Sequence, residues 1–281
     1  MKVSAVVNMH REGRLVNSAL RSLQRNLSAL DDHRVPFEAI LILDSPDDAT
    51  REVAQEFCPS GGRLMEVAVR DLGGARNMAI EAAAGEFIAF LDADDIWGDE
   101  WLLRALQAAE CEAQPTVWHP EASLYFGAGD PYWFIHRDDD ILGWDWQTLA
   151  LRNHWTALCF APRALLRELP YKPVQLDRGQ GYEDWSFNMD VVVASHRHCV
   201  VPGTLHLIRM RPDSLVRVSA RQNTLVSPSD LFIRRVGAGA AVHVDYAPET
   251  DVFPTNVAGQ GWRTSQHPAP FTWDNQSPST K

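Results

Sequence analysis

The chain has 281 residues and a formal net charge of −11 at pH 7. The length allows an ample hydrophobic core, and the acidic balance argues against nucleic acid or an anionic membrane surface as the main partner, because both require a basic footprint. Four widely spaced cysteines favour reduced thiols, and no apolar stretch approaches the roughly 20 residues that span a membrane, so we expect a cytoplasmic protein.

The first elements follow an alternating pattern of strands and helices. The run Val3–Asn8 is rich in β-branched residues and indicates a buried strand. A second strand, Glu38–Leu43, ends at Asp44, and Asp48 is expected to cap a helix over Ala49–Phe57. Between the strands, apolar residues recur at spacings of three and four and predict an amphipathic helix: Val16, Leu20, Leu23, Leu27 and Leu30.

A pair of glycines precedes the next predicted helix. Met65–Arg70 indicates a third strand, and Gly73 and Gly74 follow it, with Arg76 in the first turn of the helix. Glycines let the backbone approach a ligand closely, and a helix N-terminus offers free N–H groups to an anion. We therefore expect an anionic ligand near this helix start; a surface salt bridge is the alternative for Arg76 itself.

An apolar run, Phe87–Leu91, stops abruptly at the carboxylates of Asp92, Asp94 and Asp95. Such a run indicates a buried strand, and ligands of open α/β sheets bind at the carboxyl ends of strands. Aspartates one residue apart provide hard oxygen ligands for Mg²⁺ or Mn²⁺, which bind phosphate oxygens in turn. Alternatively, these aspartates only end the strand and cap a helix predicted over Trp97–Ala113.

The middle of the chain, residues 115–155, is rich in aromatic and acidic residues. Aromatic faces rimmed by carboxylates suit sugar binding, so we expect this region to form the acceptor side of a cleft, although any single tryptophan is more typical of the core. The residues concerned are Trp118, Trp133, Trp144, Trp146, Trp155, Asp138, Asp139 and Asp140.

Two further segments complete the set of candidates. Glu183 and Asp184 open a helix predicted to run to about Ala194. At the N-terminus of this helix, the helix dipole would stabilise their negative charge. A final pair of strands is predicted over Cys199–Val201 and Thr204–Met210. Strand alternation in the second of these places His206 on one side and Arg209 on the other.

In order and approximate spacing, these segments resemble the family 2 glycosyltransferases, inverting enzymes with the nucleotide-sugar-binding fold called GT-A. The resemblance runs from about Val3 to about Leu215. It implies an α/β fold with a mixed, mostly parallel central sheet flanked by helices. It also implies a GT-A domain at 1–226, with a donor half at about 1–114 and an acceptor half at about 115–226, and a partly irregular C-terminal extension at 227–281.

The resemblance implies a binding site for a nucleoside-diphosphate sugar. Asp44 matches the aspartate that binds the nucleoside of the donor, although the segment that follows it is also ordinary turn chemistry. The other residues implied to contact the donor are Arg76, Asp92, His10 and Arg209. His10 lies in Asn-Met-His-Arg, where many relatives have Thr-x-Asn, and the alternative for it is that it only starts the following helix. Only Asp44 survives of a usual pair of aspartates.

The resemblance also implies the chemistry. Asp94 is the direct ligand of Mg²⁺ or Mn²⁺, with Asp92 and His206 as further candidates, and Asp95 only caps or orients. Asp184 matches the general base, which takes a proton from the acceptor hydroxyl, and Glu183 supports it. The expected partners are a nucleotide-sugar donor and a saccharide or other hydroxyl acceptor.

Two other functions fit the same residues. Nucleotidyl transfer on this fold also uses carboxylate-bound Mg²⁺, but it would release pyrophosphate rather than a nucleoside diphosphate. A non-catalytic sugar- or nucleotide-binding module would bind the donor without transfer. The donor sugar, its base, the acceptor and the oligomeric state are left open by the sequence.

Overall fold

The computed structural model describes residues 1–59, 61–139, 146–231 and 233–234. Asp140, Trp144 and most of the predicted C-terminal extension lie outside the described residues. Within them, no helix is long and apolar enough to cross a lipid bilayer, and all four cysteines are free thiols.

Four parallel strands form the first half of the central sheet, in the order β3-β2-β1-β4. They are β1 (Val3–Met9), β2 (Phe37–Asp44), β3 (Arg63–Val67) and β4 (Phe87–Asp92). Strands β1, β2 and β4 are buried almost throughout, which explains their nearly continuous apolar runs. The strands predicted in this half are confirmed, with ends shifted by a few residues.

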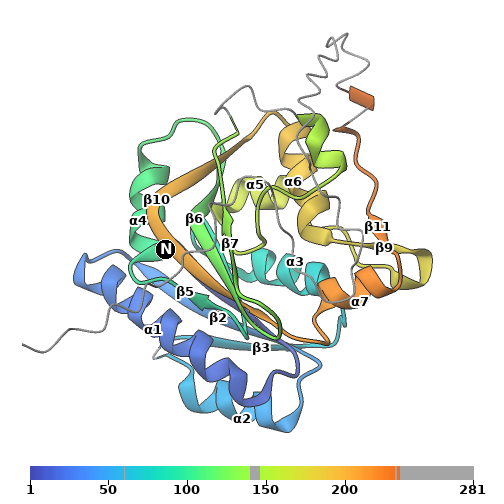
Figure 1. Cartoon of the computed structure of the whole chain (residues 1–281). Coiled ribbons are helices and arrows are strands. Elements are labelled where there is room, and N and C mark those ends of the chain that lie inside the picture. Colours follow the sequence, from blue (N-terminus) through green and yellow to red (C-terminus); the bar gives the residue numbers. More distant parts are fainter. Residues whose placement is uncertain (60, 140–145, 232, 235–281) are drawn as a thin grey trace, which may run out of the picture.

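Helices cover both faces of this sheet. Figure 1 shows three of them gathered on one side, α1 (Val16–Asp32), α2 (Asp48–Phe57) and α4 (Trp101–Glu110), and three on the other, α3 (Leu72–Ala82), α5 (Arg163–Glu168) and α6 (Glu183–Val193). Each set of helices packs its apolar side chains against one face of the strands, so two hydrophobic clusters sandwich the sheet.

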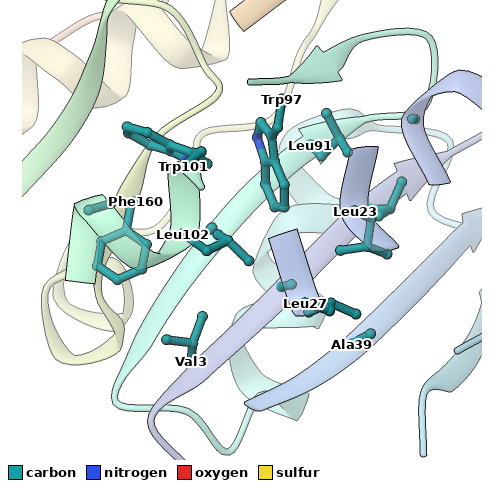
Figure 2. Close-up of a cluster of buried hydrophobic side chains, with 14 of the residues drawn as sticks. Val3, Leu23, Leu27, Ala39, Leu91, Trp97, Trp101, Leu102 and Phe160 are labelled. Carbon is teal, nitrogen blue, oxygen red and sulfur yellow. The ribbon is translucent and has the colours of Figure 1, made fainter. Parts of the chain in front are cut away.

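The larger cluster contains the predicted helical stripe. Figure 2 shows Leu23 and Leu27 of α1 directed at the same buried region as Leu91 of β4. All five residues of the stripe are at most 5% exposed, so the predicted amphipathic helix is confirmed. Trp97 and Trp101 fill the end of this cluster and are completely buried.

A short antiparallel strand joins the two halves of the sheet. Strand β8 (Phe160–Pro162) pairs antiparallel with both β4 and β6 (Thr116–Gly127), so β4 and β6 run in the same direction. β10 (Arg197–Met210) is parallel to β6, with a register shift between Val201 and Leu205. The carboxyl ends of β1, β2, β4, β6 and β10 therefore lie at one edge of the sheet, where a ligand site is expected.

The remaining elements are short. β5 (Ile96–Trp97) and β7 (Tyr132–Ile135) pair antiparallel with β10 and β6, and β9 (Gln180–Gly181) and β11 (Leu225–Val226) pair with each other. Helix α7 covers Leu215–Arg221, and single 3₁₀ turns cover Gly13–Leu15, Trp146–Ala150 and Leu176–Arg178.

Three local predictions were wrong. Trp97 belongs to β5, so the helix predicted over Trp97–Ala113 covers only Trp101–Glu110. Asp47 rather than Asp48 caps α2, because its side chain accepts from the backbone N–H of Thr50. The two predicted C-terminal strands form the single strand β10, which the register shift interrupts without ending it.

Buried histidines form a polar cluster beside β6 and β10. Nε2 of His119 lies 2.9 Å from Nδ1 of His198, and the rings of His136 and His119 stack with centroids 5.7 Å apart. Nε2 of His136 lies 3.2 Å from the hydroxyl of Thr156. Burial lowers the pKa of His136 and that of His198 to about 3, so these rings are neutral in the folded protein.

Replacing His136 by glutamine is expected to flatten the dependence of stability on pH. The folded-state pKa is lowered, so the unfolded chain binds the extra proton as the pH falls below about 6.5. One such histidine lowers the free energy of unfolding by roughly 1 kcal/mol per pH unit between its two pKa values. Urea unfolding of both proteins at pH 7.5, 6.5 and 5.5 measures this slope, and identical slopes would contradict the burial of a neutral ring.

Candidate active site

The carboxyl end of β4 places Asp92 beside a buried arginine. Nη2 of Arg76 donates to both carboxylate oxygens of Asp92, at 3.0 and 3.2 Å. The side-chain amide of Asn8 on the neighbouring strand β1 also reaches Oδ1 of Asp92, at 3.3 Å. Asn8 and Asp92 are register partners in the parallel ladder, so the pairing of β1 and β4 sets this contact.

Arg76 connects this strand end to the start of α6. Its side chain is completely buried, and Nη1 donates to Oε1 of Glu183 at 2.9 Å. The guanidinium lies 5.3 Å from the ring of Tyr171. Burial by itself lowers the pKa of Arg76, but the carboxylates of Asp92 and Glu183 outweigh burial and raise it. Arg76 is therefore charged, and its terminal nitrogens contact protein carboxylates rather than facing outward toward a donor.

Helix α6 begins with the two predicted catalytic carboxylates. Glu183 is buried against Arg76, whereas Oδ2 of Asp184 accepts from Nδ2 of Asn153 at 3.0 Å. Burial raises the pKa of Asp184 to about 7, the negative charge of Glu183 adds to the effect, and Arg76 opposes it. A carboxylate with this pKa is matched to accepting a proton near neutral pH.

The turn after β4 places Asp94 against Arg211. Nε of Arg211 lies 2.8 Å from Oδ2 of Asp94. Burial raises the pKa of Asp94 to about 6, although Arg211 opposes the shift. Nε of Arg209 donates to the backbone oxygen of Asp94 at 3.1 Å. Asp95 accepts from the backbone N–H of Arg209 at 2.7 Å, so it ties the turn to β10, in keeping with the predicted orienting role.

The carboxylate of Asp94 could hold a divalent cation only together with further ligands. Among the described residues, no group of three or more His, Cys, Asp or Glu side chains is arranged to hold a metal ion. Mg²⁺ in enzymes that use phosphorylated substrates is commonly held by one or two carboxylates, with water and substrate phosphates completing its shell. Asp94 has the chemistry for such a site, in which the substrate would supply further ligands.

The structure does not bring His206 to this carboxylate. His206 lies on the face of β10 opposite to Arg209 and Arg211, by strand alternation, and its ring packs edge-on against that of Trp101 at 4.7 Å. The ring is completely buried, and within the described part of the chain neither of its nitrogens has a hydrogen-bond partner. The geometry therefore removes His206 from the set of metal-ligand candidates.

Asp44 and His10 lie together at the ends of β2 and β1. The carboxylate of Asp44 accepts from the backbone N–H groups of Arg70 and Asp71, at 2.8 and 3.0 Å. Nδ1 of His10 donates to the backbone oxygen of Asp44, and the His10 side chain is exposed. These contacts hold two of the predicted donor-binding residues at the ligand edge of the sheet.

The two glycines in the first turn of α3 approach the protein's own chain rather than open space. A Cβ atom on Gly73 would lie 2.8 Å from the backbone oxygen of Lys172, and one on Gly74 would lie 2.6 Å from a methyl of Val69. Asp71 caps the helix, accepting from the N–H of Gly74 at 2.6 Å. The two glycines therefore allow close packing of the chain here, and anion binding at this helix start stays a prediction.

The site thus contains three groups of predicted residues, together with Asn153, which the sequence did not suggest. In the first group, His10 contacts Asp44. In the second, Arg76 binds both Asp92 and Glu183. In the third, Arg209 contacts Asp94 in the turn after β4. Asn153 was missed, since it is a single polar residue in a loop without a motif.

Comparison with known proteins connects the chain to enzymes of sugar transfer. Residues 4–163 match the family model described as glycosyl transferase family 2. The uncharacterized glycosyltransferase alr2836 of Nostoc sp. is 30% identical over 122 residues, which are 42% of this chain and 36% of that protein. The chain spans about a third of the length of the first curated relatives that it matches.

Two solved structures share the fold. TarS of S. aureus in complex with UDP-GlcNAc has a TM-score of 0.60 at 20% identity, covering 83% of this chain and 64% of that chain. The mannosyltransferase PcManGT from Pyrobaculum calidifontis, in complex with GDP-Man and Mn²⁺, has a TM-score of 0.56 at 15% identity, covering 87% and 70%. The predicted fold class, a mixed central sheet flanked by helices, is confirmed.

Loss of the Arg76 charge is expected to destabilise the protein strongly. The variant Arg76→Met keeps much of the side-chain volume but leaves the carboxylates of Asp92 and Glu183 without their partner, which typically costs about 3–5 kcal/mol. Urea unfolding at pH 7.5 measures the loss in the free energy of unfolding. The matched control is Arg25→Ala, because Arg25 pairs with Asp99 on the exposed surface and such pairs contribute little. Equal stability of the two variants would contradict the bridge.

Proposed function

The chain belongs to glycosyltransferase family 2, and on that premise we propose that it moves a sugar from a nucleoside-diphosphate sugar to an acceptor hydroxyl with inversion at the anomeric carbon. The donor class is supported by the UDP-GlcNAc and GDP-Man in the two solved structures of similar fold. The donor is assigned to about residues 1–114 and the acceptor, a saccharide or another hydroxyl compound, to about 115–226.

One observation carries the proposal: Arg76 binds Asp92 and Glu183 at the same time. It therefore brings the start of α6 to the ligand edge of the sheet, so that Asp184 adjoins the carboxyl end of β4. A single displacement requires the base and the leaving group on opposite sides of the anomeric carbon. Here the proposed base and the leaving-group site lie on two different elements. The raised pKa of Asp184, about 7, supports its role as the general base.

In the proposed reaction, Asp184 accepts the proton of the acceptor hydroxyl while the oxygen attacks the anomeric carbon. The new C–O bond forms on the face opposite the nucleoside diphosphate, and the bond to the diphosphate oxygen breaks with its electron pair leaving on that oxygen. Glu183 and Arg76 hold the first turn of α6 in place during this step. No covalent intermediate with the enzyme is needed.

The leaving group is assigned to the Asp94 side of the site. Mg²⁺ or Mn²⁺ bound by Asp94 would supply positive charge that offsets the charge on the departing diphosphate. Arg209 is held beside this turn by its bond to the backbone oxygen of Asp94, where its guanidinium is suited to phosphate oxygens. At the other end, Asp44 and His10 are assigned to the nucleoside, because carboxylates accept hydrogen bonds from base and ribose groups.

A metal-dependent rise in melting temperature is expected with one nucleoside diphosphate. Ligands that bind only the folded state stabilise it by mass action, by about 2.7 kcal/mol at one hundred times Kd. Thermal unfolding with UDP, GDP, dTDP or CDP, each with and without Mn²⁺, identifies the base. The variant Asp94→Asn should lose the rise, whereas Asp99→Asn, an exposed aspartate nearby in sequence, should retain it. No shift of the unaltered protein by any nucleotide would overturn the donor site.

Activity is expected to rise with pH through about 7, because the proposed base must be deprotonated and the pKa of Asp184 is raised to that value. The rate of nucleoside diphosphate release from the donor, measured between pH 5.5 and 9, reports this limb. Asp184→Asn is expected to lose about 10²- to 10⁴-fold in rate. Asp190→Asn, on the same helix but paired with Lys172, is the control, and equal rates of the two variants would contradict the assignment.

A further inference from the structure

The first turns of α6 hold a loop that no sequence motif marks. Nε1 of Trp185 donates to the backbone oxygen of Leu149 at 2.7 Å, and Nδ2 of Asn188 donates to the backbone oxygen of Trp155 at 3.2 Å. Between these two points, Asn153 contacts Asp184. Residues 184 and 188 are one helical turn apart and lie on one face of α6, so the same face carries the proposed base and the support of the loop.

Only one assignment of donor and acceptor atoms satisfies all the hydrogen bonds around Asn153. The backbone oxygen of Trp155 can only accept, so the nitrogen of the Asn188 amide must face it. That nitrogen also donates to Oδ1 of Asn153 at 2.8 Å. The amide of Asn153 is then oriented with its Nδ2 toward Oδ2 of Asp184, 3.0 Å away. The backbone of the loop thus determines, through two amides, that a donor points at the carboxylate.

We propose that Asn153 is a positioning residue for the transfer reaction, which holds the carboxylate of Asp184 in the orientation that receives the acceptor's proton. The inference rests on the proposed function of Asp184 as the general base. An N–H donor stabilises the charged form of a carboxylate, so Asn153 both orients the base and favours its deprotonated state.

Other groups around Asp184 act on it from different elements. The charge of Glu183 raises its pKa and that of Arg76 lowers it, after the larger effect of burial. Burial raises the pKa values of Tyr125, Tyr171 and Tyr182, and the charge of Asp184 adds to each of these shifts. These groups are unchanged by a substitution at Asn153, so a shift in the titration of Asp184 in such a variant reports the lost N–H donor.

A purely structural role for Asn153 has a different signature. The same loop is held by the bond from Trp185 and by apolar packing of Leu149 and Trp155 against Met189 and Val192 of α6. The variant Trp185→Phe loosens the loop without removing the donor to Asp184. It is therefore the matched control: a loop effect changes the rate by a similar factor at every pH, whereas loss of the donor moves the pH profile.

The test compares the full chain with its Asn153→Ala and Trp185→Phe variants by the rate of nucleoside diphosphate release between pH 5.5 and 9.5. In Asn153→Ala the acidic limb is expected to move up by about one pH unit, since the charged carboxylate loses one hydrogen bond. The rate relative to the unaltered protein then falls about ten-fold at pH 6 and approaches parity at pH 9. Trp185→Phe should keep the original midpoint.

A second measurement does not depend on turnover. Carboxyl ¹³C NMR of protein labelled at aspartate, with the Asp184 signal assigned by its absence in Asp184→Asn, gives the titration midpoint directly. A higher midpoint in Asn153→Ala supports the inference. An unchanged midpoint in Asn153→Ala, in a protein whose unaltered form turns over the donor, overturns it and leaves the proposed function intact. An unaltered protein that releases no nucleoside diphosphate from any donor overturns the proposed function, and with it the positioning role of Asn153.

Discussion

The buried guanidinium of Arg76 is the contact on which the rest of the site depends. It lies between Asp92, at the end of a strand in the first half of the sheet, and Glu183, which opens a helix more than ninety residues later. A buried arginine without carboxylate partners would be strongly unfavourable, and so would the buried carboxylate of Glu183 without the arginine. Because each group needs the other, α6 packs against the sheet with Glu183 beside Arg76. This packing in turn fixes the position of Asp184, the next residue of the helix.

The ionisation of the site follows from this arrangement. Asp184 and Asp94 are both buried enough for their pKa values to rise, but they have different neighbours: Glu183 lies beside Asp184, whereas Arg211 pairs with Asp94. Pairing with Arg211 favours the charged form that suits a cation or a phosphate-bound metal. The neighbouring carboxylate favours proton uptake by Asp184. The two carboxyl groups thus suit the separate tasks proposed for them because of their environments rather than their residue type.

The sequence predicted what depends on neighbours along the chain. The helical stripe of α1, the parallel strands and the aspartates after β4 were found because periodicity and motifs are local signals. Contacts between distant segments were not predictable. The arginine motif did not reveal that Arg76 is buried on Glu183, strand alternation did not show what His206 packs against, and Trp97 was assigned to a helix because its partner strand lies about one hundred residues away. Asn153 makes three hydrogen bonds that no sequence motif predicts.

The most direct test of a single displacement with Asp184 as base is the anomeric configuration of the first product. Proton NMR, recorded before mutarotation or with a glycoside acceptor, distinguishes the two anomers of the transferred sugar. A donor with an α-linked sugar should give a β-linked product, because attack from the face opposite the diphosphate inverts the carbon. An α-linked product would require two displacements or attack from the same face, and it would contradict the role assigned to Asp184.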